Sequence, residues 1–290
     1  MVRFPLGNLV VGLNSTVFLD QKFYKEEDAK VSILDHGYLY GNGCWTTMMT
    51  SGDRIFFIDD HMDRLLESAN IIGLDIPWTK NQIKDWTLQT YDKNKHLSGR
   101  SRIRVGLYKG VGSSIVVGTT DCEPSINIIV SPYPVAEEER AVEKGLHTIT
   151  VPADRPYAKS KNCNYLPSYV AVTKAKQQGK DDAIFINYNG DVTESTTGNL
   201  FYIKDDIIYT AEYDILYGIT RKVILDYRKD IVETMYKLET LLEADEVFIS
   251  GTTKLIIPVV QINDTIIGDG KPGKQTMQLR KEISDWINLT

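Results

Sequence analysis

Short strand-like runs alternate with single helical patterns along the chain, and this alternation is the feature that most constrains the fold. Residues 54–72 show both patterns: RIFFI is typical of a strand, and the residues after it place Met62, Leu65, Leu66, Ala69 and Ile72 on one helix face. The segments YNGD and IKDDI are typical of hairpin connections between strands. Hairpin-linked strands interrupted by isolated helices favour an α+β fold over a doubly wound parallel sheet.

The length of 290 residues suits about two domains. The stretch SPYPVAEEERAVEKG combines proline-containing turns with a run of charges, which is typical of a connection between domains. We therefore predict an N-terminal domain over 1–128, a linker over 129–136 and a C-terminal domain over 137–290. In the second half the patterns predict helices at about 165–179, 219–230 and 275–287.

Composition narrows the function classes. A hydrophobic fraction of 42% with 25% charged residues is typical of a soluble enzyme, and a net charge of -6 without a basic stripe argues against nucleic-acid binding. Three separated cysteines and four histidines argue against a zinc site and favour a reducing compartment. We find neither a signal-peptide core nor an apolar run of membrane-spanning length. These features predict a cytoplasmic protein without a metal or a membrane partner.

Two lysines one residue apart stand in the stretch RPYAKSKNCNYL, at 159 and 161. A lysine becomes a Schiff-base nucleophile when it is desolvated or lies near other positive charge. A carbonyl cofactor on either lysine would need a phenol near its ring oxygen and a carboxylate near its ring nitrogen, which Tyr165 and Glu194 could supply. The residues alone equally allow two exposed lysines and a core tyrosine.

Three further segments could surround such a cofactor. Glu194 in GDVTESTTGNLF is flanked by small and hydroxyl residues, so a ring could approach its carboxylate, although a glutamate after a turn is commonly solvated. LYGITR and ISGTTK place glycines and threonines at a predicted helix start and after a predicted strand. Backbone N–H groups at a helix start bind anions such as phosphate, while simple capping by Thr220 is the alternative.

Six segments occur together in an order that resembles one family. They are LDHGYLYGNGCWTTM, DDHMDRLLESA, KNCNYL, GDVTESTTGNLF, LYGITR and EADEVFISGTTKLIIPV, spread over about residues 30–270. The chain resembles the fold-type IV (class IV) pyridoxal-phosphate enzymes, which include branched-chain and D-amino-acid aminotransferases and aminodeoxychorismate lyases. The resemblance implies a smaller N-terminal α/β domain, a larger C-terminal domain with a β-barrel-like sheet, pyridoxal 5'-phosphate as cofactor and a homodimer.

The resemblance also implies roles for single residues. The lysine three positions before the Asn of the NYL-type segment anchors the cofactor in the lyase and D-amino-acid branches, which selects Lys161, whereas the branched-chain position falls on Ser160. Tyr165 would contact the ring oxygen and Glu194 the ring nitrogen. The phosphate would be held by Arg64, Ile219, Thr220 and Thr252.

Substrate recognition is less determined by the resemblance. Arg104 falls where branched-chain enzymes place an arginine that meets a glutamate side chain, and Arg102 lies two residues earlier on the same strand face, although both could be ordinary ion-paired residues. Thr46 stands where the family commonly has Glu, as in the lyases, but the loop YKGVGSSIVVG lacks the arginine that the lyases carry there. We expect the substrate to contact Tyr40, Trp45, Thr46, Arg102, Arg104 and Thr253.

These expectations combine into one prediction and three alternatives. We predict an aminotransferase that moves an amino group between an amino acid, branched-chain or another L-amino acid, and a 2-oxo acid such as 2-oxoglutarate. An aminodeoxychorismate lyase, which releases pyruvate and 4-aminobenzoate, is the alternative that Thr46 favours. A catalytically silent homologue that binds the cofactor, or an interaction protein that has lost it, are alternatives of another class.

Overall fold

The computed structural model describes residues 14–97 and 99–287, and the chain divides into two compact units. The first unit holds the chain up to residue 137 together with 160–163, and the second holds 138–159 and the chain from 164 on. Residues 129–132 of the predicted linker continue strand β6 (Glu123–Pro132), and the charge run after it forms helix α4 (Val135–Lys144). The short lysine segment 160–163 therefore belongs to the first unit, although its neighbours on both sides belong to the second.

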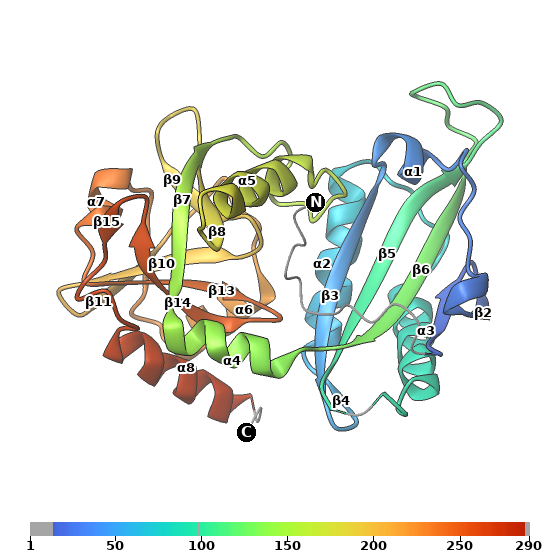
Figure 1. Ribbon diagram of the computed structural model, residues 1–290. Coiled ribbons are helices and arrows are strands. Elements are labelled where there is room, and N and C mark those ends of the chain that lie inside the picture. Colours follow the sequence, from blue (N-terminus) through green and yellow to red (C-terminus); the bar gives the residue numbers. More distant parts are fainter. Residues whose placement is uncertain (1–13, 98, 288–290) are drawn as a thin grey trace. The chain divides into compact units, whose positions relative to one another are not determined.

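A six-stranded sheet forms the centre of the first unit (Figure 1), in the order β2-β1-β6-β5-β3-β4. Every described pairing in this sheet is antiparallel. The other strands are β1 (Thr16–Leu19), β2 (Lys22–Lys25), β3 (Gly43–Ser51), β4 (Arg54–Ile55) and β5 (Ser101–Val111). The helices of this unit are η1 (Glu26–Asp28), α1 (His36–Tyr40), α2 (Ile58–Ile71) and α3 (Lys80–Lys93).

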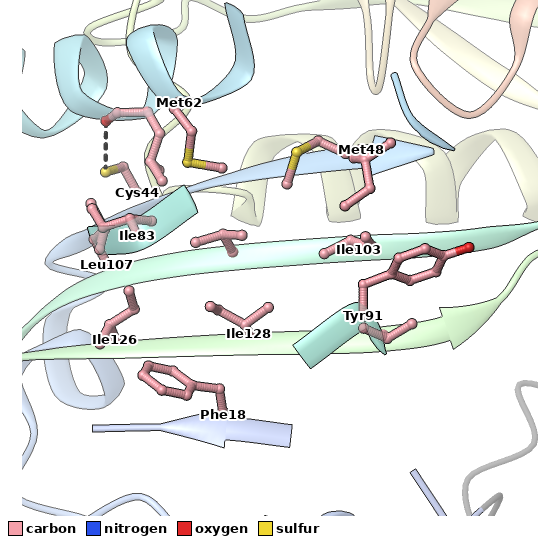
Figure 2. Close-up of a cluster of buried hydrophobic side chains, with 14 of the residues drawn as sticks. Phe18, Cys44, Met48, Met62, Ile83, Tyr91, Ile103, Leu107, Ile126 and Ile128 are labelled. Carbon is pink, nitrogen blue, oxygen red and sulfur yellow. Dashed lines mark hydrogen bonds between the residues drawn. The ribbon is translucent and has the colours of Figure 1, made fainter. Parts of the chain in front are cut away.

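The alternation of side chains along β3, β5 and β6 gives the sheet two different faces. On one face, apolar residues pack against α2 and α3 and form the core that Figure 2 shows, which includes Cys44, Met48, Met62, Ile83, Ile103, Leu107, Ile126 and Ile128. The register pairs Thr47 with Arg104 and Met49 with Arg102, so these residues share the opposite face with Trp45. The covered face is a dry core, and the opposite face carries the two predicted substrate arginines.

The second unit contains a closed ring of six strands. Strands β10, β13, β14, β7, β8 and β9 pair in that order, and β9 pairs back to β10, which confirms the barrel-like sheet. Their bounds are β7 (Leu146–Pro152), β8 (Asp182–Ile186), β9 (Val192–Ser195), β10 (Asn199–Lys204), β13 (Glu246–Gly251) and β14 (Leu255–Ile262). Strands β11 (Ile207–Thr210), β12 (Val232–Glu233) and β15 (Thr265–Ile266) extend the sheet beyond the ring.

Besides α4, most of which belongs to this unit, the described residues form four further helices here: α5 (Leu166–Gln177), α6 (Ile219–Tyr227), α7 (Leu238–Leu242) and α8 (Lys274–Trp286). Three of them confirm the helices predicted from the sequence. Arg280 of α8 donates to the carbonyl oxygens of Lys254 (2.8 Å) and Ile256 (2.6 Å) and to Glu138 Oε1 of α4 (2.7 Å), so it ties both helices to β14. None of the helices within the described residues is both long and apolar enough to cross a membrane.

Candidate functional site

The lysine segment 160–163 runs along the edge of β3 that lies opposite β5. The N–H of Trp45 donates to the carbonyl of Lys161, and the N–H of Cys163 donates to the carbonyl of Gly43, both at 2.9 Å. These bonds extend the sheet by a short stretch of backbone. The position of Lys161 is therefore fixed by β3 and does not depend on a flexible loop.

Ser68 of α2 fixes the same segment from the helix side. Its Oγ accepts a bond from the N–H of Lys161, and its carbonyl accepts one from the hydroxyl of Ser160, both at 3.0 Å. Ser160 is completely buried. The position at which branched-chain enzymes carry their lysine is thus a buried structural serine, and Lys161 is the neighbouring residue with an amine.

The side chain of Lys161 lies over the indole ring of Trp45, with Nζ 4.1 Å from the ring centroid. The guanidinium carbon of Arg104 lies 3.9 Å from the same centroid. Cations bind the faces of tryptophan rings through the ring quadrupole, most strongly where water is excluded. The structure thus brings three predicted site residues together, and Arg102 follows on the same sheet face.

Lys159 has a different environment. It belongs to the second unit, where its Nζ lies 5.5 Å from the ring centroid of Tyr217. Of the two lysines, Lys161 is the one that belongs to the same unit as Trp45 and Arg104 and contacts the ring of Trp45. This difference favours Lys161 as the reactive amine.

A buried polar network lies on the helix-covered side of β3. Arg64 donates to Thr46 Oγ1 at 3.0 Å, and Thr46 Oγ1 lies 2.8 Å from His61 Nδ1. Because Thr46 accepts from Arg64, its own proton is directed to Nδ1 of a neutral His61. The structure therefore places Thr46, predicted to contact substrate, in full burial as a partner of the predicted phosphate residue Arg64.

His61 should make stability depend on pH. Burial, followed by the charges of Arg64 and Lys161, holds the pKa of His61 well below its ordinary value of 6.5. The unfolded chain therefore binds a proton near pH 6.5 that the folded chain does not bind, so the stabilisation present above pH 6.5 is lost as the pH falls. We expect the unfolding free energy to fall by up to about 1.4 kcal/mol per pH unit between pH 6.5 and 5.

Urea unfolding of a His61→Gln variant measures this dependence. The variant should be less stable at pH 7 but should lose this component of the pH slope. His96→Gln, at an exposed position, serves as the control and should keep the wild-type slope. An unchanged slope in the His61 variant would show that His61 binds protons equally in both states.

The thiol of Cys163, in the lysine segment, and that of the neighbouring Cys44 both stay protonated. Burial and the neighbouring Cys163 raise the pKa of Cys44 to about 12, and burial raises the pKa of Cys163 to about 11. A thiolate is the nucleophilic form of cysteine. Neither thiol therefore competes with Lys161 as a nucleophile near neutral pH.

Glu194 is a buried carboxylate of the second unit, and it lies in β9. Arg155 forms an ion pair with its Oε1, and the N–H of Leu216 is 3.3 Å from each carboxylate oxygen. Asn199 Nδ2 lies 3.4 Å from Oε2. All of these partners are donors, so the surroundings favour an ionised acceptor that could hold a protonated ring nitrogen.

The predicted phosphate residues of the second unit occupy two turns. Ile219 and Thr220 are buried in the first turn of α6, which begins after Gly218 without a side-chain cap. Thr252 and Thr253 are half-buried between β13 and β14. An uncapped helix start offers backbone N–H groups to an anion, so these residues fit the phosphate group of the expected cofactor.

Two predicted residues lie in other settings. Tyr165 is half-buried at the residue before α5, in the second unit. Tyr40 lies in α1 of the first unit, where its hydroxyl donates to the carbonyl of Ile115. No group of three or more His, Cys, Asp or Glu side chains that could hold a metal ion occurs among the residues the structure describes.

The sequence reasoning missed four residues that hold the predicted ones. His61 and Ser68 lie three residues before and four after Arg64 on α2, so helical spacing alone could have assigned them to one face. Arg155 and Asn199 contact Glu194 from separate elements. A single sequence carries no local signal for such a contact.

Comparisons with known proteins show which family the chain resembles. The family model described as amino-transferase class IV matches residues 43–262. A Methanocaldococcus jannaschii protein, named as a candidate branched-chain-amino-acid aminotransferase, is 34% identical and is matched over 93% of this chain and 95% of its own length. The D-alanine aminotransferase of Staphylococcus epidermidis is 31% identical, with 93% and 97% of the two chains covered.

Solved structures give the same result. The branched-chain aminotransferase of Thermoproteus uzoniensis with norvaline superposes with a TM-score of 0.86 at 27% identity and covers 94% of both chains. A T.th. branched-chain amino acid aminotransferase with pyridoxamine 5'-phosphate superposes with a TM-score of 0.88 at 26% identity, again over 94% of both chains. The similarity thus extends over both units.

Proposed function

Because this chain belongs to the class IV aminotransferase family, we propose that it uses pyridoxal 5'-phosphate to move an amino group from a branched-chain or similar L-amino acid to a 2-oxo acid such as 2-oxoglutarate. The observation that carries the substrate proposal is the stacking of both Lys161 and Arg104 on Trp45. A reactive amine and a carboxylate-binding guanidinium on one ring suit an amino acid with a second carboxylate, such as glutamate.

The residues of the chain would hold the cofactor and move one proton. When bound, pyridoxal phosphate supplies an electron-withdrawing ring that makes the α-proton of the amino acid acidic. Lys161 would hold the cofactor through its amine, with loss of water from the carbonyl carbon, and Nζ would take that proton once the amine of the substrate has displaced it. Glu194 would keep the ring nitrogen protonated, and Tyr165 would donate to the ring oxygen.

The phosphate would be held by a charge and by backbone donors. Arg64 would supply the charge, and Ile219, Thr220 and Thr252 would supply N–H and hydroxyl groups. The hydrogen bond from Arg64 to Thr46, which itself bonds the neutral His61, orients the guanidinium without cancelling its charge. We therefore assign Thr46 to the positioning of Arg64.

Replacing Arg64 with alanine should weaken cofactor binding at least about tenfold, because a hydrogen bond to a charged group contributes about 1.5 to 3 kcal/mol. Fluorescence titration with pyridoxal phosphate measures the dissociation constant. Arg54→Ala, which removes an arginine that lies over Phe56, is the matched control and should bind as the wild type does. An Arg64→Ala protein with wild-type affinity would remove Arg64 from the phosphate site.

Two observations support the proposal of amino transfer from L-amino acids over the other reactions of the family. The relatives named above support amino transfer rather than the lyase reaction. Residues 108–118 contain neither the arginine of the lyases nor the arginine and histidine that resemblance assigns to D-amino-acid enzymes in this loop. Arg104, on the sheet face of Trp45, would instead bind the substrate carboxylate in the first unit.

A panel of L- and D-amino acids tests this proposal, read as the change in the cofactor's visible absorption during the first half-reaction. L-glutamate and branched-chain L-amino acids should bleach the band. Arg104→Ala should slow the reaction of L-glutamate about tenfold or more, with a smaller effect on L-leucine, because only glutamate carries a second carboxylate. A response to D-alanine alone, or pyruvate formation from aminodeoxychorismate without any response to amino acids, would contradict the proposal.

We also propose that the enzyme is a homodimer. Apolar side chains on the outside of the first unit support this proposal, since α1, the segment before it and the β5–β6 loop expose Ile33, Leu34, Tyr38, Ile115, Val116 and Val117. The bonds from His36 to the carbonyl of Ser114 (2.9 Å) and from Tyr40 to that of Ile115 hold this loop against α1. Exposed apolar side chains on neighbouring segments are typical of an interface, and sedimentation velocity would measure the mass of the assembly.

A further inference from the structure

Asn199 is buried at the start of β10. Its amide lies against residues 216–218, the short segment that leads into α6. Its Nδ2 donates to the carbonyl of Leu216 at 2.7 Å and lies 3.4 Å from Glu194 Oε2. The N–H of Leu216 in turn lies 3.3 Å from both oxygens of Glu194. The main chain of Leu216 is thus held at its N–H by the carboxylate and at its C=O by the amide.

The same amide also occupies the space beside Gly218, the N-cap residue of α6. A Cβ added to Gly218 would lie 2.3 Å from Asn199 Oδ1, well inside contact distance. The φ of Gly218 is -65°, which any residue can adopt, so this close approach and not backbone conformation requires glycine here. The amide of Asn199 therefore packs directly against the turn from which the first N–H groups of α6 emerge.

Asn199 is also placed by the sheet. It pairs with Glu194 on β9 and with Ser250 on β13, at the point where β9 closes the ring of strands. Paired residues on adjacent strands project from the same face, so the side chain of Asn199 stands beside that of Glu194. The two neighbouring strands thus fix the position of the amide independently of its contact with the α6 turn.

We propose that Asn199 is a positioning residue that sets Glu194 and the N-terminal turn of α6 in a fixed relation to each other. This inference rests on the proposed function, in which Glu194 contacts the ring nitrogen and the α6 turn contacts the phosphate. In pyridoxal phosphate a short CH₂–O arm joins the phosphate to the ring, so the two contacts must lie within the limited span of one molecule. An amide meets this need because it donates to Glu194 without adding a charge beside it.

Two variants and one control test the inference. Asn199→Asp keeps the size of the side chain but loses both N–H donors and adds a carboxylate next to Glu194. Asn199→Ser removes the amide without adding charge. Asn263→Asp is the control, because Asn263 also belongs to this unit but lies between β14 and β15, where its Nδ2 donates to Thr150 Oγ1 (3.0 Å).

The first measurement compares the affinities of each variant for pyridoxal phosphate and for pyridoxal, which lacks the phosphate. Both Asn199 variants should bind pyridoxal several-fold more weakly, and their preference for pyridoxal phosphate over pyridoxal should fall by about tenfold, because both ends of the site shift. The control should keep the wild-type preference. Wild-type affinities, or equal losses for the two ligands, would overturn the inference.

The second measurement does not depend on the cofactor. Hydrogen exchange of the apoprotein should become faster at the amides of residues 216–222 in both Asn199 variants and should stay unchanged there in the control. Unchanged exchange at these amides would overturn the inference whether or not the protein binds pyridoxal phosphate. Failure of the wild type to bind pyridoxal phosphate would instead reject the proposed function, so the two failures are distinguishable.

Discussion

Replacing Lys161 with alanine should abolish amino transfer while leaving the fold intact. The amine has two tasks in the proposed reaction, as cofactor anchor and as proton acceptor, and general acid–base catalysis alone contributes about 10² to 10⁴-fold. We therefore expect a loss of at least about 10⁴-fold in kcat. The bonds that place this residue involve its backbone N–H and C=O, with Ser68 and Trp45, and alanine can make both.

Lys159→Ala is the matched control, because it removes a lysine two residues away that belongs to the second unit. We expect this variant to keep most of its activity. Steady-state kinetics with L-glutamate would measure both variants, and circular dichroism would confirm their folding. A folded Lys161→Ala protein that still transfers amino groups near the wild-type rate would contradict the assignment.

Replacing Glu194 with glutamine should lower kcat by about 10² to 10³-fold, the effect typical of removing one preorganised electrostatic contact. Glutamine has the same shape, but it cannot hold a proton on the ring nitrogen by charge. The change also leaves Arg155, whose side chain is 14% exposed, without its ion-pair partner. Loss of a partner from a mostly buried pair destabilises a protein, so lower stability is expected as well.

A second variant separates the two effects. Arg155→Gln combined with Glu194→Gln removes both charges, so it should recover much of the stability that the single change loses. It should not recover the rate, because the ring nitrogen still lacks its carboxylate. If the double variant regained wild-type kcat, the role of Glu194 would be structural and the proposed contact with the ring nitrogen would be wrong.

Local sequence patterns predicted most of the regular structure because the responsible forces are local. The period of two along β3, β5 and β6 separates the covered core from the face that carries Arg102 and Arg104. Helix α3 was not predicted, since it is mostly polar, yet its start carries a visible signal: Thr79 and Gln82 form a reciprocal capping box. Attention to caps would have found this helix.

Local sequence patterns could not predict contacts between residues that are distant in the sequence. The charge run of α4 resembles a solvated linker, but Glu138 is buried and pairs with Arg280, which is far from it in the sequence. The ion pair of Arg155 with Glu194 joins residues from separate elements in the same way. Family resemblance pointed to Lys161, Glu194 and Arg64. Of the residues that hold them, His61 and Ser68 follow helical spacing from Arg64, whereas Arg155 and Asn199 became visible only in the structure.

The most direct test of the account is borohydride reduction of the protein loaded with pyridoxal phosphate, followed by digestion and peptide sequencing by mass spectrometry. The reagent fixes the cofactor to the lysine that carries it. Fragmentation must resolve residues 159 and 161, because one peptide can contain both. We expect the cofactor on Lys161, whose amine lies 4.1 Å from the ring centroid of Trp45. Modification of Lys159, or of no lysine in this segment, would contradict the account.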